Sequence, residues 1–194
     1  CDKFGAFLME EEVLALQQTI KSSECLHISS GESGPSVLGM ENYSGVVEYH
    51  PEELVITLKA GTSINEIQEL LKNNNQALPF FVDEGVKSVG SAYAQGGANF
   101  SDYVLGVQVI TGDGDILNFG GQVMKNVAGY DVSRLLVGSM GKVVLITQVT
   151  FKVLPKTYVD KMILSKKPKL ATSQLHKDIE NKLKEVFDPR GIFI

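Results

Sequence analysis

The chain has 194 residues, of which 43% are hydrophobic and 21% charged, and these values are ordinary for a globular domain with a packed core. Its net charge of −5 argues against nucleic acid as a partner, because neutralising phosphates requires a basic surface. No apolar run reaches the roughly 18 residues that span a bilayer, and acidic residues interrupt the first segment where a signal peptide is apolar, so we expect a cytoplasmic protein without a transmembrane segment.

Charge is unevenly distributed along the chain. From Lys152 onward there are ten basic and five acidic residues, whereas the preceding residues hold eight basic and eighteen acidic ones. The basic end can dock on the acidic body or on a partner, or it can form a solvated lysine-rich helix, and composition leaves these alternatives open. Cys1, Cys25 and the three histidines do not have the spacing of a zinc site, so we expect no metal.

The beginning of the chain predicts a small lobe of mixed helices and strands. Apolar residues at helical spacing predict an amphipathic helix over residues 9–22. A short apolar strand over residues 25–29 follows, and then a loop rich in glycine and serine over residues 30–39. Residues 45–61 read as two β-rich runs joined at a proline, which is the pattern of a β-hairpin.

A second helix is predicted directly after this hairpin. Ser63 followed three residues later by Glu66 is a capping-box pattern, and the asparagines at residues 73–75 end the helix. With a further short strand, residues 1–82 make up an N-terminal α/β lobe.

The rest of the chain predicts a larger lobe dominated by a sheet. Residues 102–121 are two strands around a Gly-Asp-Gly turn at Gly112–Gly114, a strong hairpin signal, and residues 142–155 are a long β-branched strand that a proline ends. We therefore expect a second lobe over residues 83–155. For residues 156–194 we expect one more short strand, within 158–167, and a helix over 171–187.

Three glycine-rich segments are candidates for a binding site: Ser29–Gly34, Ser88–Gly97 and Gly138–Gly141. Glycine permits positive φ and lets backbone N–H groups converge on an anion, so such loops suit a pyrophosphate, although each one taken singly is also consistent with a tight turn. None has the spacing of a P-loop or of a Rossmann fingerprint. The histidines and the Asp83–Glu84 pair form no catalytic constellation, and we assign no catalytic residue.

One longer stretch carries a family resemblance. The segment GQVMKNVAGYDVSRLLVGSMG at residues 121–141, continued by ITQVTFKVLP, closely resembles the PCMH-type FAD-binding domain of the flavoprotein family typified by vanillyl-alcohol oxidase, and in particular the GlcE-type subunits of glycolate oxidase. The order of the other parts is similar to that family from about Met9 to Pro155, and the final FDPRGIFI looks like its usual terminus.

This resemblance implies an α+β fold of two lobes that hold FAD between them. Lys125, Tyr130 and Asp131 would keep the loop over residues 121–141 in shape. The cofactor-binding residues that the resemblance implies are Ser30, Gly31, Ser33 and Gly34 in the first loop, Val89, Gly90, Ala94, Gly96 and Gly97 in the second, and Gly138, Ser139, Gly141, Leu145 and Ile146 in the third.

The chain also departs from the family pattern. The first loop lacks the usual arginine and carries Glu32, the loop after Gly97 is short, and no substrate or cap domain lies between Pro155 and the terminus. The resemblance thus implies an FAD-binding subunit of a glycolate oxidase-like complex that oxidises 2-hydroxy acids, an FAD-dependent oxidoreductase when the cofactor is bound. Its partners would be the other subunits, through which any membrane association would pass, and a homo-oligomer is also open. The alternative is a flavin-free scaffold of the same fold.

Overall fold

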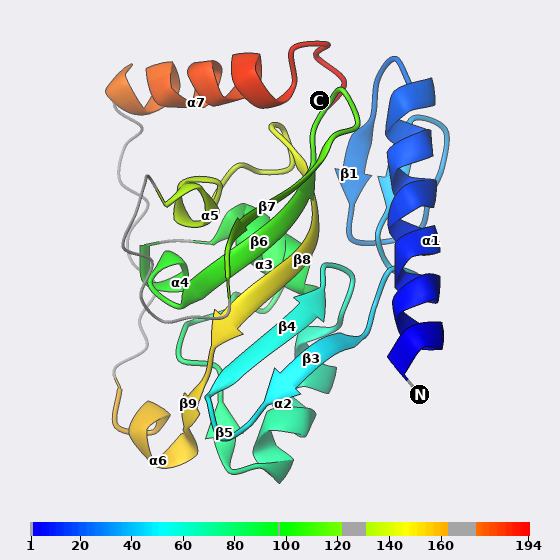
Figure 1. The fold of residues 1–194 in the computed structure, drawn as a ribbon. Helices are drawn as coiled ribbons and strands as arrows, with labels where there is room; N and C mark the ends of the chain where they lie inside the picture. Colours follow the sequence, from blue (N-terminus) through cyan, green and yellow to red (C-terminus); the bar gives the residue numbers. More distant parts are fainter. Residues whose placement is uncertain (1, 97, 122–130, 163–173) are drawn as a thin grey trace.

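A five-stranded antiparallel sheet forms the centre of the molecule (Figure 1). The computed structural model describes residues 2–96, 98–121, 131–162 and 174–194. The strand order is β3-β4-β8-β6-β7, with bounds β3 Val46–His50, β4 Val55–Lys59, β8 Leu145–Lys152, β6 Val104–Ile110 and β7 Ile116–Gly120. Both predicted hairpins are confirmed, since β3 pairs with β4 and β6 pairs with β7. Strands from both sides of residue 82 share this sheet, and the lobe boundaries remain predictions.

The two faces of the sheet differ in chemistry because side chains alternate along each strand. One face is apolar: Ile56 pairs with Phe151 and Leu58 with Val149, all at most 2% exposed. The ring of Phe151 lies 5.3 Å from that of Phe80 and joins an aromatic cluster on this face. On the other face the Thr57 and Thr150 hydroxyls are hydrogen-bonded at 2.9 Å. This second face is buried as well, since Thr57 and Thr150 are each 8% exposed and Val55 is 2% exposed.

Short helices and a two-residue strand pair cover the apolar face. These are α2 Ile64–Asn73, β5 Gln76–Ala77, α3 Val89–Gln95, α4 Ala98–Ser101, α5 Val132–Leu135 and β9 Leu154–Pro155, with β5 paired to β9. The capping box of α2 is confirmed, with the Ser63 N–H donating to the Glu66 carboxylate at 3.3 Å. As the asparagine run predicts, α2 ends at Asn73, and Asn75 takes a positive φ of 54°.

The N-terminal segment packs beside this sheet as a separate layer (Figure 1). It consists of α1 Asp2–Ser22 and two parallel strands, β1 His27–Ser29 and β2 Val37–Gly39. An ion pair between Glu12 and Lys59 and a hydrogen bond of 2.7 Å from the Gln17 amide to the Gly114 carbonyl join α1 to the central sheet. A cavity lies between β1 and helix α3.

The end of the chain differs in part from expectation. The strand predicted within residues 158–167 is wrong at its start, because residues Lys156–Val159 form helix α6, and residues 163–173 lie outside the described part. Pro155 precedes α6 with a φ of −54°, and Lys156 pairs with Asp160 one turn later, which favours a helical turn.

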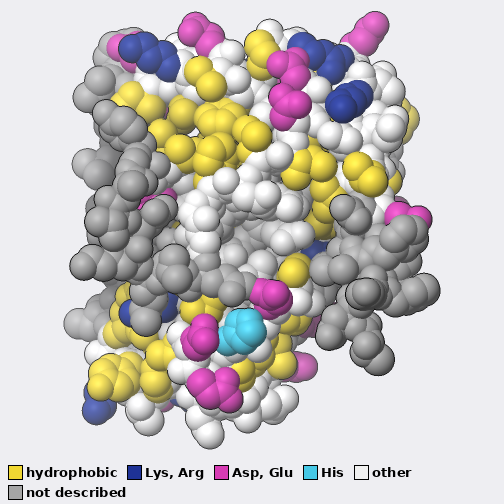
Figure 2. Space-filling model, in the orientation of Figure 1, with side chains coloured by type: hydrophobic (Ala, Val, Ile, Leu, Met, Phe, Trp, Pro, Cys, Tyr) yellow, Lys and Arg dark blue, Asp and Glu magenta, His cyan; other side chains and the backbone are white. Residues whose placement is uncertain are grey.

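The predicted final helix is confirmed as α7 Gln174–Phe187. Basic and acidic side chains mix along its outer surface, at the top of Figure 2. Lys177 and Lys182 are exposed, while Lys184 and Arg190 donate hydrogen bonds to carbonyls of the body. Within the described part of the basic end, Lys177 and Lys182 are thus solvated, whereas Lys184 and Arg190 are docked on the body. Over the described ranges, no helix is long and apolar enough to cross a bilayer.

Candidate cofactor-binding site

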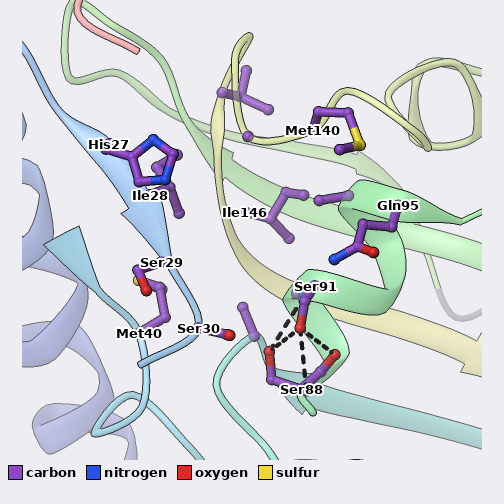
Figure 3. A pocket seen from close by; sticks show the side chains of 15 residues that line it. His27, Ile28, Ser29, Ser30, Met40, Ser88, Ser91, Gln95, Met140 and Ile146 are labelled. Carbon is purple, nitrogen blue, oxygen red and sulfur yellow. Dashed lines mark hydrogen bonds between the residues drawn. The ribbon is translucent and has the colours of Figure 1, made fainter. Parts of the chain in front are cut away.

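A cavity of about 270 Å3 lies between β1 and α3, and Figure 3 shows its lining. This volume is just below the roughly 300 Å3 at which ligand pockets usually begin, so the cavity can enclose only part of a dinucleotide. On one side are residues 27–30, which we term the β1 wall; on the other are residues 88–95 and 138–146, which we term the α3 wall. Met40 and Ala60 complete the lining.

The backbone N–H groups in the first turn of α3 donate hydrogen bonds to other groups of the protein. The N–H groups of Val89 and Gly90 donate to the carbonyls of Thr62 and Ala60, at 3.0 and 2.6 Å. The Ser91 N–H donates to the Ser88 hydroxyl. What this part of the wall offers a ligand is therefore side-chain hydroxyl groups: Ser88 and Ser91 both line the cavity, and their oxygens lie 2.7 Å apart.

Gly90 permits the close approach of α3 to β4. A Cβ at this position would lie 3.0 Å from both the Cβ and the carbonyl oxygen of Ala60, which is tighter than ordinary van der Waals contact. The glycine therefore brings the helix onto the strand and leaves the cavity open above it.

The segment Gly138–Gly141 is clasped to the end of α3. Gly138, Met140 and Gly141 have φ values of +88°, +54° and +72°, a conformation that favours glycine. The N–H of Gly138 donates to the Tyr93 carbonyl and that of Met140 to the Ala94 carbonyl, at 3.0 and 2.9 Å. This clasp turns the segment toward the β1 wall.

Gly141 closes the cavity across to β1. A Cβ on Gly141 would lie 3.5 Å from the Cβ of Ile28, so the two walls are in near contact at this end. The neighbouring Ser139 has a buried hydroxyl that lacks a hydrogen-bond partner within the described part of the chain. A buried polar group of this kind usually has a partner, but Ser139 does not line the cavity.

The loop that follows β1 is folded back on itself. Its turn wraps around Gly39, where a Cβ would come within 2.3 Å of the Gly31 carbonyl oxygen. The Ser33 hydroxyl accepts a hydrogen bond from the Gly39 N–H at 3.0 Å. Ser33 and Gly34 line a different, open depression beside α1. Glu32 is exposed and does not line the cavity, so its charge lies outside the site.

The structure brings some of the sequence-predicted site residues to the cavity and leaves others around it. Gly31 and Gly96 adjoin lining residues, and Gly97 lies outside the described residues. Val89 is buried beneath the α3 wall. Leu145 is fully buried and, by strand alternation, points to the opposite face of β8 from Ile146. Those that line the cavity are Ser30, Gly90, Ala94, Gly141 and Ile146. The assignment as a whole remains a prediction.

Several lining residues carry no motif in the sequence. Ser88, Ser91 and Gln95 lie within the second glycine-rich segment and could have been found from that position. Met40 and Ala60 come from the end of β2 and of β4, and only the packing of these strands brings them to the cavity. His27 and Ile28 belong to β1, whose short apolar pattern gave no sign of a ligand.

The cavity is nearly uncharged. Among the described residues that line it, none is Lys, Arg, Asp or Glu, and His27 is the one titratable side chain. Serine hydroxyls, the Gln95 amide and small or apolar side chains make up the rest. These groups fit a large planar ligand with many hydrogen-bonding atoms, and they would meet a diphosphate with neutral donors rather than with cations.

A buried tyrosine supports the α3 wall from behind. Tyr93 is fully buried, and its hydroxyl donates a hydrogen bond to the Ser133 carbonyl. Burial, with a smaller contribution from the charge of Asp131, raises the pKa of Tyr93 above its usual value. The phenol therefore stays protonated and fixes α3 to α5.

Comparison with known proteins gives a consistent result. A model of the family described as FAD binding domain matches residues 21–120. The chain is 42% identical to the glycolate oxidase subunit GlcE of Escherichia coli K12 in an alignment of 129 residues. This alignment covers 61% of this chain and 37% of that relative.

The alignments with two further relatives cover smaller shares of those relatives. Over 64 residues the chain is 44% identical to the glycolate oxidase subunit GlcD of Bacillus subtilis 168, covering 33% of this chain and 14% of the relative. Over 129 residues it is 26% identical to a D-2-hydroxyglutarate dehydrogenase of Xanthomonas citri, covering 62% and 27%. The chain thus spans between 14% and 37% of the length of these three relatives.

Proposed function

Because the chain belongs to the FAD-binding domain family, we propose that it holds FAD in the cavity between the β1 wall and the α3 wall, as the FAD-binding subunit of a glycolate oxidase-like complex. The observation that carries this proposal is that the three glycine-rich segments, remote in sequence, converge on or around one uncharged cavity. The relatives named as glycolate oxidase subunits support the class of reaction, the oxidation of a 2-hydroxy acid.

The residues of the two walls divide the work of holding the cofactor. Ser30 on the β1 wall offers a hydroxyl group, and the Ser88 and Ser91 hydroxyls, which are bonded to each other, leave at most one free donor on the α3 wall. Gly90 lets α3 approach Ala60, and Gly141 lets the α3 wall approach Ile28. The isoalloxazine of bound FAD supplies the redox chemistry, and the protein supplies position and exclusion of water.

Substrate oxidation requires more than these residues. The described lining holds no carboxylate or lysine that could take a proton from a hydroxy acid, and the chain spans only 37% of its GlcE relative. We therefore propose that other subunits complete the substrate site and receive the electrons. Measuring the mass of the purified assembly distinguishes a complex with other subunits from one made only of copies of this chain.

A titration with FAD tests the proposal directly. We expect the purified protein to take up FAD and to absorb at about 450 nm, as flavins do. We expect no bleaching by glycolate until partner subunits are added. A colourless protein that refuses added FAD would instead establish the flavin-free scaffold.

A substitution in the cavity locates the binding site. Gly141→Val places a branched side chain against Ile28 at a φ of +72°, and we expect FAD binding to fall below detection. Gly45→Val is the matched control, because Gly45 also has a positive φ, +126°, but nothing within 4 Å of its Cβ position. If both variants bound FAD equally, the cavity would not be the site.

A further inference from the structure

Lys184, near the end of α7, joins three groups with its ammonium. It donates to the Asp188 carboxylate at 2.6 Å, to the Lys142 carbonyl at 2.7 Å and to the Phe193 carbonyl. An ammonium has three donors, and all of them are used. The Asp188 side chain is fully buried, whereas that of Lys184 is 33% exposed.

These contacts lead to both walls of the cavity. Lys142 directly follows Gly141, the lining residue at which the α3 wall meets Ile28. Phe193 forms a parallel β-bridge with Leu26, and Leu26 immediately precedes the first residue of the β1 wall. One ammonium thus bonds a residue of the α3 wall and the segment that is paired to Leu26, just before the β1 wall.

Asp188 holds the last residues in the shape that this link needs. Its two carboxylate oxygens accept the N–H groups of Ile192 and Phe193 at 2.8 and 2.9 Å. The Ile192 carbonyl in turn accepts the Leu26 N–H at 2.7 Å. We term residues 188–194 the C-terminal strap. It meets the chain just before β1 through the bridge between Phe193 and Leu26, and the Lys184–Asp188 pair is its anchor.

The strap is also fitted to the turn of the β6–β7 hairpin. The guanidinium of Arg190 donates to the Gly112 carbonyl at 3.1 Å and to the Ser23 carbonyl at the end of α1 at 3.0 Å. A Cβ at Gly112 would lie 2.0 Å from an oxygen of Asp188. The strap therefore spans from the central sheet to the N-terminal layer.

We propose that Lys184 and Asp188 are positioning residues of the cofactor pocket, which fix the β1 wall relative to the α3 wall and so set FAD affinity without touching FAD. This inference rests on the pocket assigned above. A buried charge pair is weak as a source of stability compared with apolar residues of the same size. What it adds here is directional hydrogen bonding to groups on both sides of the cavity.

The test compares FAD dissociation constants among substitutions in α7 and the strap, at a temperature where every variant is folded by circular dichroism. Lys184→Met keeps the aliphatic stem but removes the donors, and we expect FAD binding at least fivefold weaker. Asp188→Asn is expected to weaken it in the same direction. Lys184→Arg restores a cationic donor and should bind within threefold of the unaltered protein. Lys182→Met, at an exposed position of the same helix, should stay within twofold.

Two results would overturn the inference. If Lys184→Met lowered the melting temperature but kept FAD affinity within twofold, the pair would be structural only. If Lys182→Met lost as much affinity as Lys184→Met, net charge and not position would be the cause. If Lys184→Met did not fold, Asp188→Asn and Lys184→Arg would decide on the same criteria.

Hydrogen exchange without cofactor separates this inference from the proposed function. In the FAD-free protein, Lys184→Met should speed exchange of the Leu26 and Lys142 amides, which donate to Ile192 and Ser139. Failure of the unaltered protein to bind FAD would refute the proposed function alone. Unchanged exchange at both amides would refute the positioning role, whatever binds in the cavity.

Discussion

The two walls of the cavity are held in different ways. The α3 wall is bonded within itself and to the residues that follow β4: the N–H groups of Val89, Gly90, Gly138 and Met140 donate to nearby carbonyls. The β1 wall belongs to a strand of three residues, His27–Ser29, which is paired with one short strand, and the preceding residue, Leu26, forms a β-bridge with the C-terminal strap. The first wall is preorganised by its own contacts, and the second depends on segments far away in the sequence.

This difference suggests where the affinity for FAD can be adjusted. A site binds best when its groups are already placed, because ordering them on binding costs free energy. The α3 wall meets that condition through the bonds between its two segments and through its bonds to Ala60, Thr62 and Ser133. The β1 wall meets it only while its loop and the C-terminal strap stay in place, so changes there should alter binding more than stability.

The largest effect is expected at Gly39, around which the loop after β1 turns. Gly39→Ala places a Cβ within 2.3 Å of backbone atoms of Gly31 and Glu32, so the loop must move. We expect a loss of about 2–3 kcal/mol in the free energy of unfolding, as in overpacked cores, together with FAD binding at least tenfold weaker. Urea unfolding and a fluorescence titration of FAD measure the two quantities.

Gly34→Ala is the matched control in the same loop. The nearest atom to its Cβ position is the Val37 Cβ at 3.9 Å, an ordinary contact, and we expect a change in stability below about 0.5 kcal/mol. If Gly39→Ala bound FAD as well as Gly34→Ala, the β1 wall would not contribute to the site.

A smaller effect is expected behind the α3 wall, at Tyr93. Tyr93→Phe leaves the Ser133 carbonyl without its donor, and we expect unfolding to cost about 1–2 kcal/mol less at pH 7. Because the rest of the wall stays bonded, FAD affinity should change by less than threefold. If Tyr93→Phe lost more FAD affinity than Gly39→Ala, the α3 wall and not the β1 wall would be the more sensitive of the two.

The pH dependence of the difference in stability between the unaltered protein and Tyr93→Phe tests whether the Tyr93 phenol is buried. Burial raises the pKa of Tyr93 in the folded protein, while an unfolded tyrosine ionises at about pH 10. The stabilisation is therefore complete below pH 10 and is lost as pH rises above it, by up to about 1.4 kcal/mol per pH unit. Phenylalanine does not titrate, so the stability gap between the two proteins should narrow above pH 10. A constant gap would mean that the phenol is not buried.

Local patterns were enough to predict much of the fold. The Gly112–Gly114 turn predicted the β6–β7 hairpin, and Ser63 with Glu66 predicted the start of α2, because turn and cap chemistry act within a few residues. The strand expected after Pro155 failed because the apolar pattern there is short and a helical turn competes with it.

The cavity could be predicted only in part. Gly90 and Gly141 line it as the glycine pattern suggests, yet Leu145 and Ile146, adjacent in one motif, point to opposite faces of β8. Met40 reaches the lining through the parallel pairing of β1 with β2. The link between Leu26 and Phe193 joins residues remote in the chain. No local rule encodes such contacts, since they depend on how finished elements pack.

The smallest effect is expected at Glu32, where a negative charge in the first loop suggests from sequence a conflict with the diphosphate of FAD. In the structure Glu32 is exposed and does not line the cavity, so water and salt screen its charge. We expect Glu32→Gln to change the FAD dissociation constant by less than twofold, at both 50 mM and 500 mM salt. A gain of tenfold at low salt that vanishes at high salt would show that the carboxylate faces the ligand, and that the loop closes over the cavity when FAD binds.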